Sequence, residues 1–211
     1  MNYMRHTTKF LIVLILLTLM LTPAYSALQG GVDYQIPIDY TKLNQSELEA
    51  KAEFYYNSAI NSKKLDEDIT SALVLYTILT NKDPQNYKYS IRLGKLYDVI
   101  SKDKLAKGNY YRAMGLDQKR PEPYFYLGEY YYDREKYKKA LKFYQRAYDT
   151  GYSTHYYTLY RMGDIYQKFG DTKNSLKYLQ SAYGIEANND LREKIRQVED
   201  LEITGKEYYR K

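Results

Sequence analysis

Cysteine and tryptophan are absent from this chain of 211 residues, and histidine occurs only twice. Without cysteine the protein has no disulfides, no thiol chemistry and no lipid-modified cysteine, so packing alone must stabilise it. Zinc sites are built mainly from Cys and His ligands, and this composition cannot supply such a cluster. These absences exclude disulfide-rich scaffolds, cysteine-dependent enzymes and zinc domains.

Catalytic motifs are missing as well. His155 is the one histidine beyond residue 26, and no acid forms a motif with it, so we interpret it as a surface or junction residue. The glycines are dispersed and form no phosphate-binding loop. Asp149-Thr150-Gly151 resembles the triplet of aspartic proteases, but a single copy between helices is better explained as a turn. We predict no enzyme activity, no catalytic, cofactor-binding or metal-binding residues, and no cofactor.

The longest apolar run lies at the amino terminus. Arg5 and Lys9 precede the apolar segment Phe10–Leu21, and Pro23–Ala27, which is rich in small residues, follows. This order is typical of a secretory signal peptide, which we predict over residues 1–26, with cleavage at its end. The alternative is an uncleaved N-terminal membrane anchor, although the run of about 12 residues is shorter than the roughly 20 needed to span a bilayer. Both interpretations place the folded part outside the cytoplasm, periplasmic or secreted.

Positive charge exceeds negative charge without concentrating in any segment. The chain has 32 basic and 26 acidic residues, and no basic cluster is longer than a pair such as Lys63-Lys64 or Lys138-Lys139. Nucleic-acid and anionic-lipid surfaces need a stripe or a run of basic residues. We therefore expect no nucleic-acid partner, and a membrane contact only through an uncleaved N-terminal segment.

A repeated pattern is clearest in residues 121–152. In order, this segment contains Tyr124, Leu127-Gly128, Tyr131, Ala140, Tyr144 and Ala147. A matching set occurs 34 residues earlier, as Leu93-Gly94, Tyr97, Ala106, Tyr110 and Ala113. Another occurs 35 residues later, as Met162-Gly163, Tyr166, Ser175, Leu179 and Ala182. A weaker copy precedes them, with Ala72, Tyr76, Leu79 and Pro84, and with Ile60 in the place of the glycine.

The order and spacing resemble those of tetratricopeptide repeats. The resemblance implies an all-α fold, a right-handed α-solenoid of about four helix-turn-helix repeats with a C-terminal capping helix. We assign the repeats to residues 53–86, 87–120, 121–155 and 156–189 and the capping helix to 190–203, within a repeat domain spanning 47–204. Residues 27–46 are predicted to be an irregular arm, and 205–211 a polar tail after Gly205. Ser46 and Glu49 are expected to form the capping box of the first helix.

Tyrosine is the outlier of the composition, with 29 residues against five phenylalanines. Most tyrosines stand at helical spacing inside the repeats, where the pattern calls for aromatic residues. We interpret most of them as core residues whose ring is buried and whose hydroxyl reaches a wet edge.

In tetratricopeptide arrays the first helix of each repeat lines a concave groove that holds a peptide. Carrying these positions onto this sequence gives a predicted partner groove of Asn57, Asn61, Lys88, Ile91, Lys95, Asp98, Glu122, Phe125, Glu129, Tyr132, Tyr157, Tyr160, Asp164 and Gln167. Its aromatic members are expected to form an exposed patch. The Lys, Asn and Arg clamp with which co-chaperone members of the family hold a terminal carboxylate is not reproduced at the matching positions.

The resemblance implies a non-catalytic scaffold or adaptor that binds a peptide or protein segment in this groove, in a cell-envelope or secreted assembly. The alternative hypothesis is a structural repeat protein that self-associates through tyrosine-rich surfaces. Light scattering separates the two, because only self-assembly gives stable oligomers without a partner.

Overall fold

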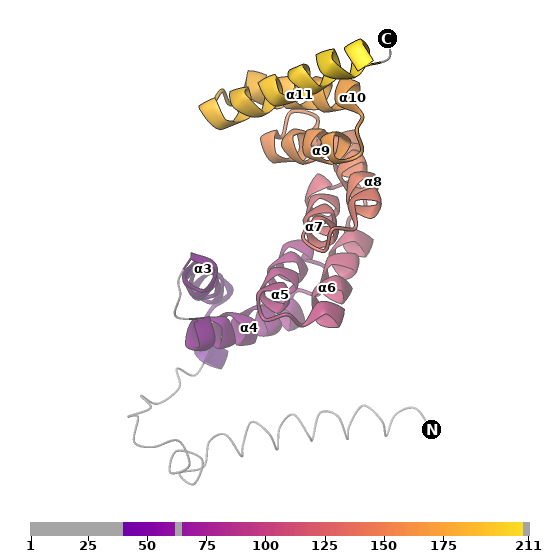
Figure 1. Cartoon of the computed structure of the whole chain (residues 1–211). Helices are drawn as coiled ribbons and strands as arrows, with labels where there is room; N and C mark the ends of the chain where they lie inside the picture. The colour runs from indigo at the N-terminus through magenta and orange to yellow at the C-terminus, as the bar shows by residue number, and fades with distance from the viewer. Residues whose placement is uncertain (1–39, 62–64, 209–211) are drawn as a thin grey trace. The chain divides into compact units, whose positions relative to one another are not determined.

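The structure, a computed structural model, describes residues 40–61 and 65–208, and every regular element in these residues is helical (Figure 1). Asn44–Lys211 is one compact unit. In the other unit, Met1–Leu43, the described residues form a short 3-10 helix, η1 (Tyr40–Lys42). The predicted signal peptide and most of the predicted arm lie outside the described residues.

The compact unit is a series of α-helices packed in sequential pairs. The helices are α3 (Gln45–Asn61), α4 (Leu65–Lys82), α5 (Tyr87–Val99), α6 (Asp103–Leu116), α7 (Pro121–Tyr132), α8 (Tyr137–Ala147), α9 (Tyr156–Lys168), α10 (Thr172–Ile185) and α11 (Asn189–Tyr208). Each odd-numbered helix from α3 to α9 packs against the next helix, and the second helix of each pair also packs against the first of the following pair. The predicted all-α solenoid of helical repeats is confirmed.

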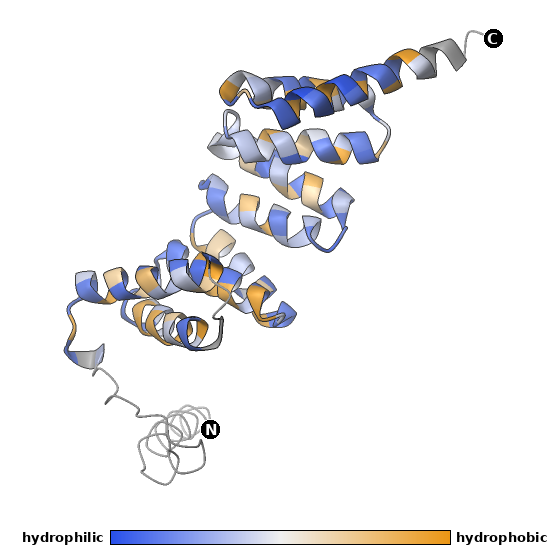
Figure 2. Cartoon of the chain, turned by 60° about the vertical axis from the view of Figure 1, so that its left-hand side comes forward, coloured by the Kyte–Doolittle hydropathy of each residue, from blue (hydrophilic) through white to orange (hydrophobic). Residues whose placement is uncertain are grey.

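Glycine permits the close approach of the paired helices. A Cβ atom added to Gly128 would lie 2.6 Å from the ring of Tyr144, and one added to Gly94 would lie 2.6 Å from the ring of Tyr110. The α9–α10 pair uses Gly163 in the same way. The rings of Tyr110 and Tyr144 are both buried. Along each helix, apolar residues alternate with hydrophilic ones (Figure 2). An aromatic ring therefore lies directly on a helix backbone in the α5–α6 and α7–α8 hairpins, and Leu179 takes this place in the α9–α10 hairpin.

The first helix starts earlier than the period of the repeats predicts. The capping box of α3 is formed by Asn44 and Glu47: the Glu47 N–H donates to Asn44 Oδ1 over 3.0 Å, and the Asn44 N–H donates to Glu47 Oε2 over 2.9 Å. The expected box of Ser46 and Glu49 is therefore wrong. Because α3 begins at Gln45, it has 17 residues, and its side chains are displaced relative to a strict 34-residue repeat.

The turn after α8 accommodates the extra residue of the third repeat. Tyr148–Tyr152 forms a single π-helical turn, η2, in which Gly151 has a φ of 141°. This backbone conformation favours glycine, because a Cβ atom would be strained there. The sequence predicts a looser turn at this point, and the structure shows one.

The C-terminal helix covers the end of the array. Figure 1 shows α11 lying along α10, and Leu191 and Val198 are buried there. The sequence predicts that the last helix ends at Gly205. This prediction is wrong, because α11 continues to Tyr208. Among the described helices, none is long and apolar enough to cross a membrane.

Filling the space at Gly128 should destabilise the protein. The methyl group of Gly128→Ala would collide with the buried ring of Tyr144, and overpacking of this kind costs about 1–3 kcal/mol. Gly108→Ala in α6 is the matched control, because nothing lies within 4 Å of the added methyl group and alanine favours a helix by about 0.5–1 kcal/mol. Urea unfolding followed by circular dichroism measures both, and equal changes would contradict this account of the packing.

Candidate functional site

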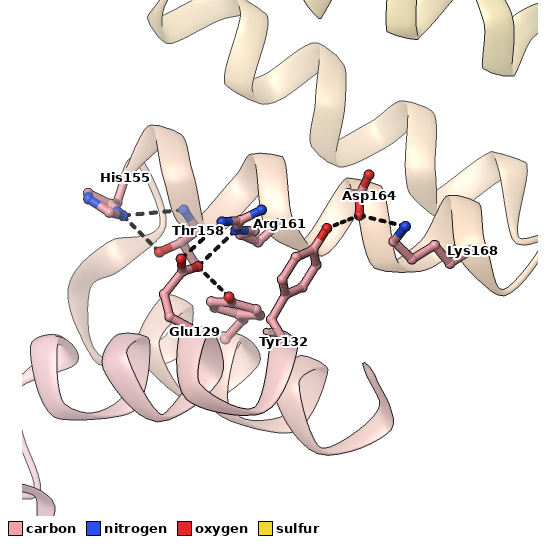
Figure 3. A network of polar contacts seen from close by, with 8 residues as sticks. Glu129, Tyr132, His155, Thr158, Arg161, Asp164 and Lys168 are labelled. Carbon is pink, nitrogen blue, oxygen red and sulfur yellow. Dashed lines mark hydrogen bonds and ion pairs between the residues drawn. The ribbon is translucent and has the colours of Figure 1, made fainter. Parts of the chain in front are cut away.

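The first helices of neighbouring repeats are joined by a polar contact at the centre of the predicted groove. Glu129 of α7 accepts hydrogen bonds from Arg161 of α9, over 2.9 Å from Nε and 3.0 Å from Nη2. The hydroxyl of Tyr144 donates to the same carboxylate. The Arg161 guanidinium lies 4.2 Å from the centre of the Tyr132 ring. Figure 3 shows these groups converging between α7 and α9.

The same contact joins the first two repeats. Arg92 of α5 donates to Glu53 of α3 over 2.7 Å, and the hydroxyl of Tyr76 donates to Glu53 over 2.6 Å. The Arg92 guanidinium lies 4.3 Å from the centre of the Tyr56 ring. Glu53 thus occupies the position of Glu129 in the third repeat.

This equivalence corrects the register of the predicted groove. The sequence prediction placed Asn61 at the position equivalent to Glu129, whereas the structure places Glu53 there, eight residues earlier in the chain. Asn57 and Asn61 are exposed, but they do not stand at the groove positions for which they were selected.

A third ion pair joins the fourth repeat to the capping helix. Asp164 of α9, only 6% exposed, accepts from Lys194 Nζ over 2.5 Å and from the Tyr132 hydroxyl over 2.5 Å. Lys168 lies 3.6 Å from the same carboxylate. Burial by itself raises the pKa of Asp164, but these hydrogen bonds and cations outweigh it, and the pKa is lowered from its usual value. Asp164 therefore stays ionised and binds α11 to the array.

The junction between α5 and α7 lacks this ion pair. Lys95 stands where the other junctions carry a carboxylate, and its Nζ lies 5.3 Å from the centre of the Tyr126 ring. Burial lowers the pKa of Lys95. The ion pair of this junction lies instead at the C-terminal ends of the two helices, where Arg134 donates to Asp98 over 2.6 Å.

The exposure of the fourteen predicted groove residues varies widely. Those exposed are Asn57, Asn61, Lys88 and Tyr157; those buried are Ile91 and Asp164. The others are half-buried: Lys95, Asp98, Glu122, Phe125, Glu129, Tyr132, Tyr160 and Gln167. Ile91 and Asp164 are therefore part of the interior rather than of an exposed groove surface.

The predicted aromatic patch is largely a packed cluster. The ring of Phe125 lies 5.0 Å from that of His155, which in turn stacks on Tyr152 at 4.2 Å between centroids. His155 also caps α9, because its Nδ1 accepts from the Thr158 N–H over 3.3 Å. Burial lowers the pKa of His155, which favours this neutral acceptor form. Among the four predicted aromatic residues, Tyr157 alone is exposed, at 60%.

Two adjoining clefts lie at the amino-terminal ends of the first helices. One, of about 250 Å³, is lined by Tyr87, Lys88, Ile91, Arg92, Glu122 and Tyr126. The other, of about 430 Å³, is lined by Glu49, Glu53, Tyr76, Asn86, Lys88, Tyr89 and Arg92. Lys88 and Arg92 border both, so α3, α5 and α7 present one continuous surface. The sequence prediction included Lys88, Ile91 and Glu122 but missed the residues of α3, because their register was wrong.

Comparison with known proteins supports the fold. No protein-family model and no curated protein matches the chain. Among solved structures, PilF of Pseudomonas aeruginosa is 18% identical with a TM-score of 0.60, over 76% of this chain and 77% of that chain. PilW, a type IV pilus biogenesis factor, is 16% identical with a TM-score of 0.57, over 69% of this chain and 64% of that chain.

A third structure carries the name of the repeat. The first tetratricopeptide repeat domain of RPAP3, bound to the HSP90 peptide SRMEEVD, is 17% identical with a TM-score of 0.51, over 56% of this chain and 94% of that chain. The chain has the tetratricopeptide-repeat fold. Identities this low show the fold of the tetratricopeptide array alone. In the described part of the array, no group of three or more His, Asp or Glu side chains is placed to hold a metal ion.

Removing the carboxylate of one junction should loosen the tetratricopeptide array. Glu129→Gln leaves the half-buried Arg161 guanidinium without its charged partner and weakens the hydrogen bond from Tyr144, so we expect a loss of about 1–3 kcal/mol in unfolding free energy. Glu193→Gln is the control, since it removes the exposed ion pair with Arg196 and should change stability little. Thermal or urea unfolding measures both; similar losses would contradict a central role for the junction.

Proposed function

We propose that this tetratricopeptide array is a non-catalytic scaffold that binds an extended peptide or protein segment along the starts of α3, α5 and α7. The observation that carries the proposal is the pair of adjoining clefts that share Lys88 and Arg92. A continuous surface built from three successive first helices can follow a segment several residues long, whereas an isolated pocket cannot. Because folded helices preform the surface, only the segment must be ordered on binding.

The chemistry of the clefts favours a protein ligand over a small cofactor. The smaller cleft, at about 250 Å³, is below the usual range of roughly 300–1,000 Å³ for small-molecule sites. The clefts present both acidic and basic side chains, which suit the polar backbone and side chains of a peptide. The peptide-bound RPAP3 domain supports this use of the fold.

A photo-crosslinking experiment tests the proposal. The photoreactive residue p-benzoylphenylalanine is placed either at Lys88, which is exposed and borders both clefts, or at Lys107, an exposed residue of the second helix α6. The full chain is then irradiated in its native cells. We expect discrete protein adducts from position 88 and none from position 107.

The adducts also distinguish the alternatives. Adducts from position 107 alone would place the partner on the second helices and contradict the proposed surface. An adduct from either position with the mass of two copies of this chain would instead identify self-association. Irradiation of the unmodified chain provides the background in both cases.

We further propose that the array acts outside the cytoplasm, in the cell envelope or as a secreted protein. Support comes from the signal-like order of Arg5, Lys9 and the apolar segment Phe10–Leu21. The likeness to PilW, a pilus biogenesis factor, agrees with it.

A fusion of residues 1–44 to alkaline phosphatase tests the location. This reporter is active only after export, because its disulfides form outside the cytoplasm. We expect activity from the fusion and none when the apolar segment is interrupted by Leu14→Arg and Leu17→Arg. An inactive wild-type fusion would contradict export.

A further inference from the structure

The smaller cleft contains a carboxylate oxygen without a partner. Glu122 Oε2 is buried and accepts no hydrogen bond in the described part of the chain, although the Tyr87 hydroxyl lies close enough to this carboxylate to interact with it. A buried charged oxygen that accepts no hydrogen bond is costly, and native structures normally supply it with a partner. The cleft lined by Glu122, Tyr87 and Tyr126 is the space from which such a donor can approach.

The neighbouring cations are already engaged by other carboxylates. Arg92 forms an ion pair with Glu53 over 2.7 Å. Arg120, which directly precedes α7, forms an ion pair with Asp117 over 3.2 Å. Neither guanidinium compensates the charge of Glu122.

The second cation that lines the cleft, Lys88, is exposed and lies near Glu49. Hydrogen bonds from Tyr89 and Gln45 lower the pKa of Glu49, and the positive charge of Lys88 contributes to the lowering. Lys88 thus acts on the carboxylate of the adjoining cleft, and it forms no hydrogen bond with Glu122 Oε2.

Aromatic rings surround the same position. After burial, the charge of Glu122 is the next cause that raises the pKa of both Tyr87 and Tyr152, the latter to about 12, which shows that both hydroxyls lie near the carboxylate. Tyr126 also borders the cleft. Tyrosine faces attract cations, so a cation entering the cleft meets a carboxylate and aromatic rings together.

Glu122 also differs from its counterparts in the neighbouring repeats. It is the second residue of α7, where α5 has Lys88 and α9 has Tyr157. Pro121 precedes it at the start of the helix, and the helix dipole favours a negative charge in the first turn. Among the second residues of α5, α7 and α9, Glu122 alone is acidic.

We infer that the cleft of Glu122 receives an arginine or lysine side chain of the bound segment, with its cationic group donating to Glu122 Oε2. This inference rests on the proposed function and names the chemistry of the partner: a segment with a basic anchor residue. The HSP90 peptide SRMEEVD bound by RPAP3 has three acidic residues and one arginine, so only its arginine matches the charge of this cleft.

Selection from a phage library of random linear peptides on the immobilised full chain tests the inference. We expect peptides enriched in Arg or Lys at one aligned position. Glu122→Gln, which is isosteric, should raise the Kd of the tightest selected peptide about tenfold or more. Glu122→Lys should change the selected residue from basic to acidic. Glu67→Gln, which removes an exposed helical carboxylate of α4 outside the clefts, should leave the Kd unchanged.

A double-mutant cycle locates the contact. Replacing the aligned basic residue of the peptide by methionine should weaken binding to the wild-type chain but not to Glu122→Gln, because the interaction is already lost. Peptides that bind without a basic residue, or a Kd unaffected by Glu122→Gln, would overturn this inference and leave the proposed function standing. Recovery of no peptide by the full chain would overturn the proposed function and this inference with it.

Discussion

The carboxylate shared by a tyrosine and an arginine is the contact on which the array depends. Glu129 accepts from Tyr144 of its own hairpin and from Arg161 of the next repeat, so one side chain fixes both the hairpin and the junction. A repeat array has contacts only between neighbours, and each junction must therefore be stabilised separately. The ion pairs of these junctions are half-buried, and their charged groups form several hydrogen bonds. Such hydrogen bonds are needed to offset the cost of removing a charge pair from water.

This use of charge changes where a partner can bind. At the centres of the first helices, Glu53, Glu129 and Asp164 each form an ion pair with a cation of the next repeat or of the capping helix. A ligand that used these carboxylates would have to displace an existing ion pair, which costs more than it gains. The starts of the helices carry no such pairs, and there Lys88 is exposed and Glu122 Oε2 is unpartnered. Recognition is therefore expected at the helix starts.

The pairing of helices into hairpins could be predicted from the sequence, whereas the register of the first repeat could not. A glycine facing a ring, as with Gly128 and Tyr144, involves residues at a fixed spacing inside one hairpin, so a local pattern identifies it. The position of Glu53 depends on the lengths of α3 and α4, which have 17 and 18 residues against 13 and 14 in α5 and α6, and a fixed period of 34 residues places Asn61 there instead. The burial of Asp164 depends on Lys194, 30 residues away on another helix, and no local pattern shows such a partner.

The α5–α7 junction differs from the other junctions in its central contact. Where the other junctions have a central ion pair, this one has Lys95 over the Tyr126 ring, and the ionic contact shifts to Asp98 and Arg134 at the helix ends. The opposite ends of the same two helices are held by neither contact. The cleft of about 250 Å³ lies at these opposite ends, bordered by Tyr87 and Glu122. The oxygen of Glu122 that accepts no hydrogen bond thus lies at the end of this junction opposite to its ion pair.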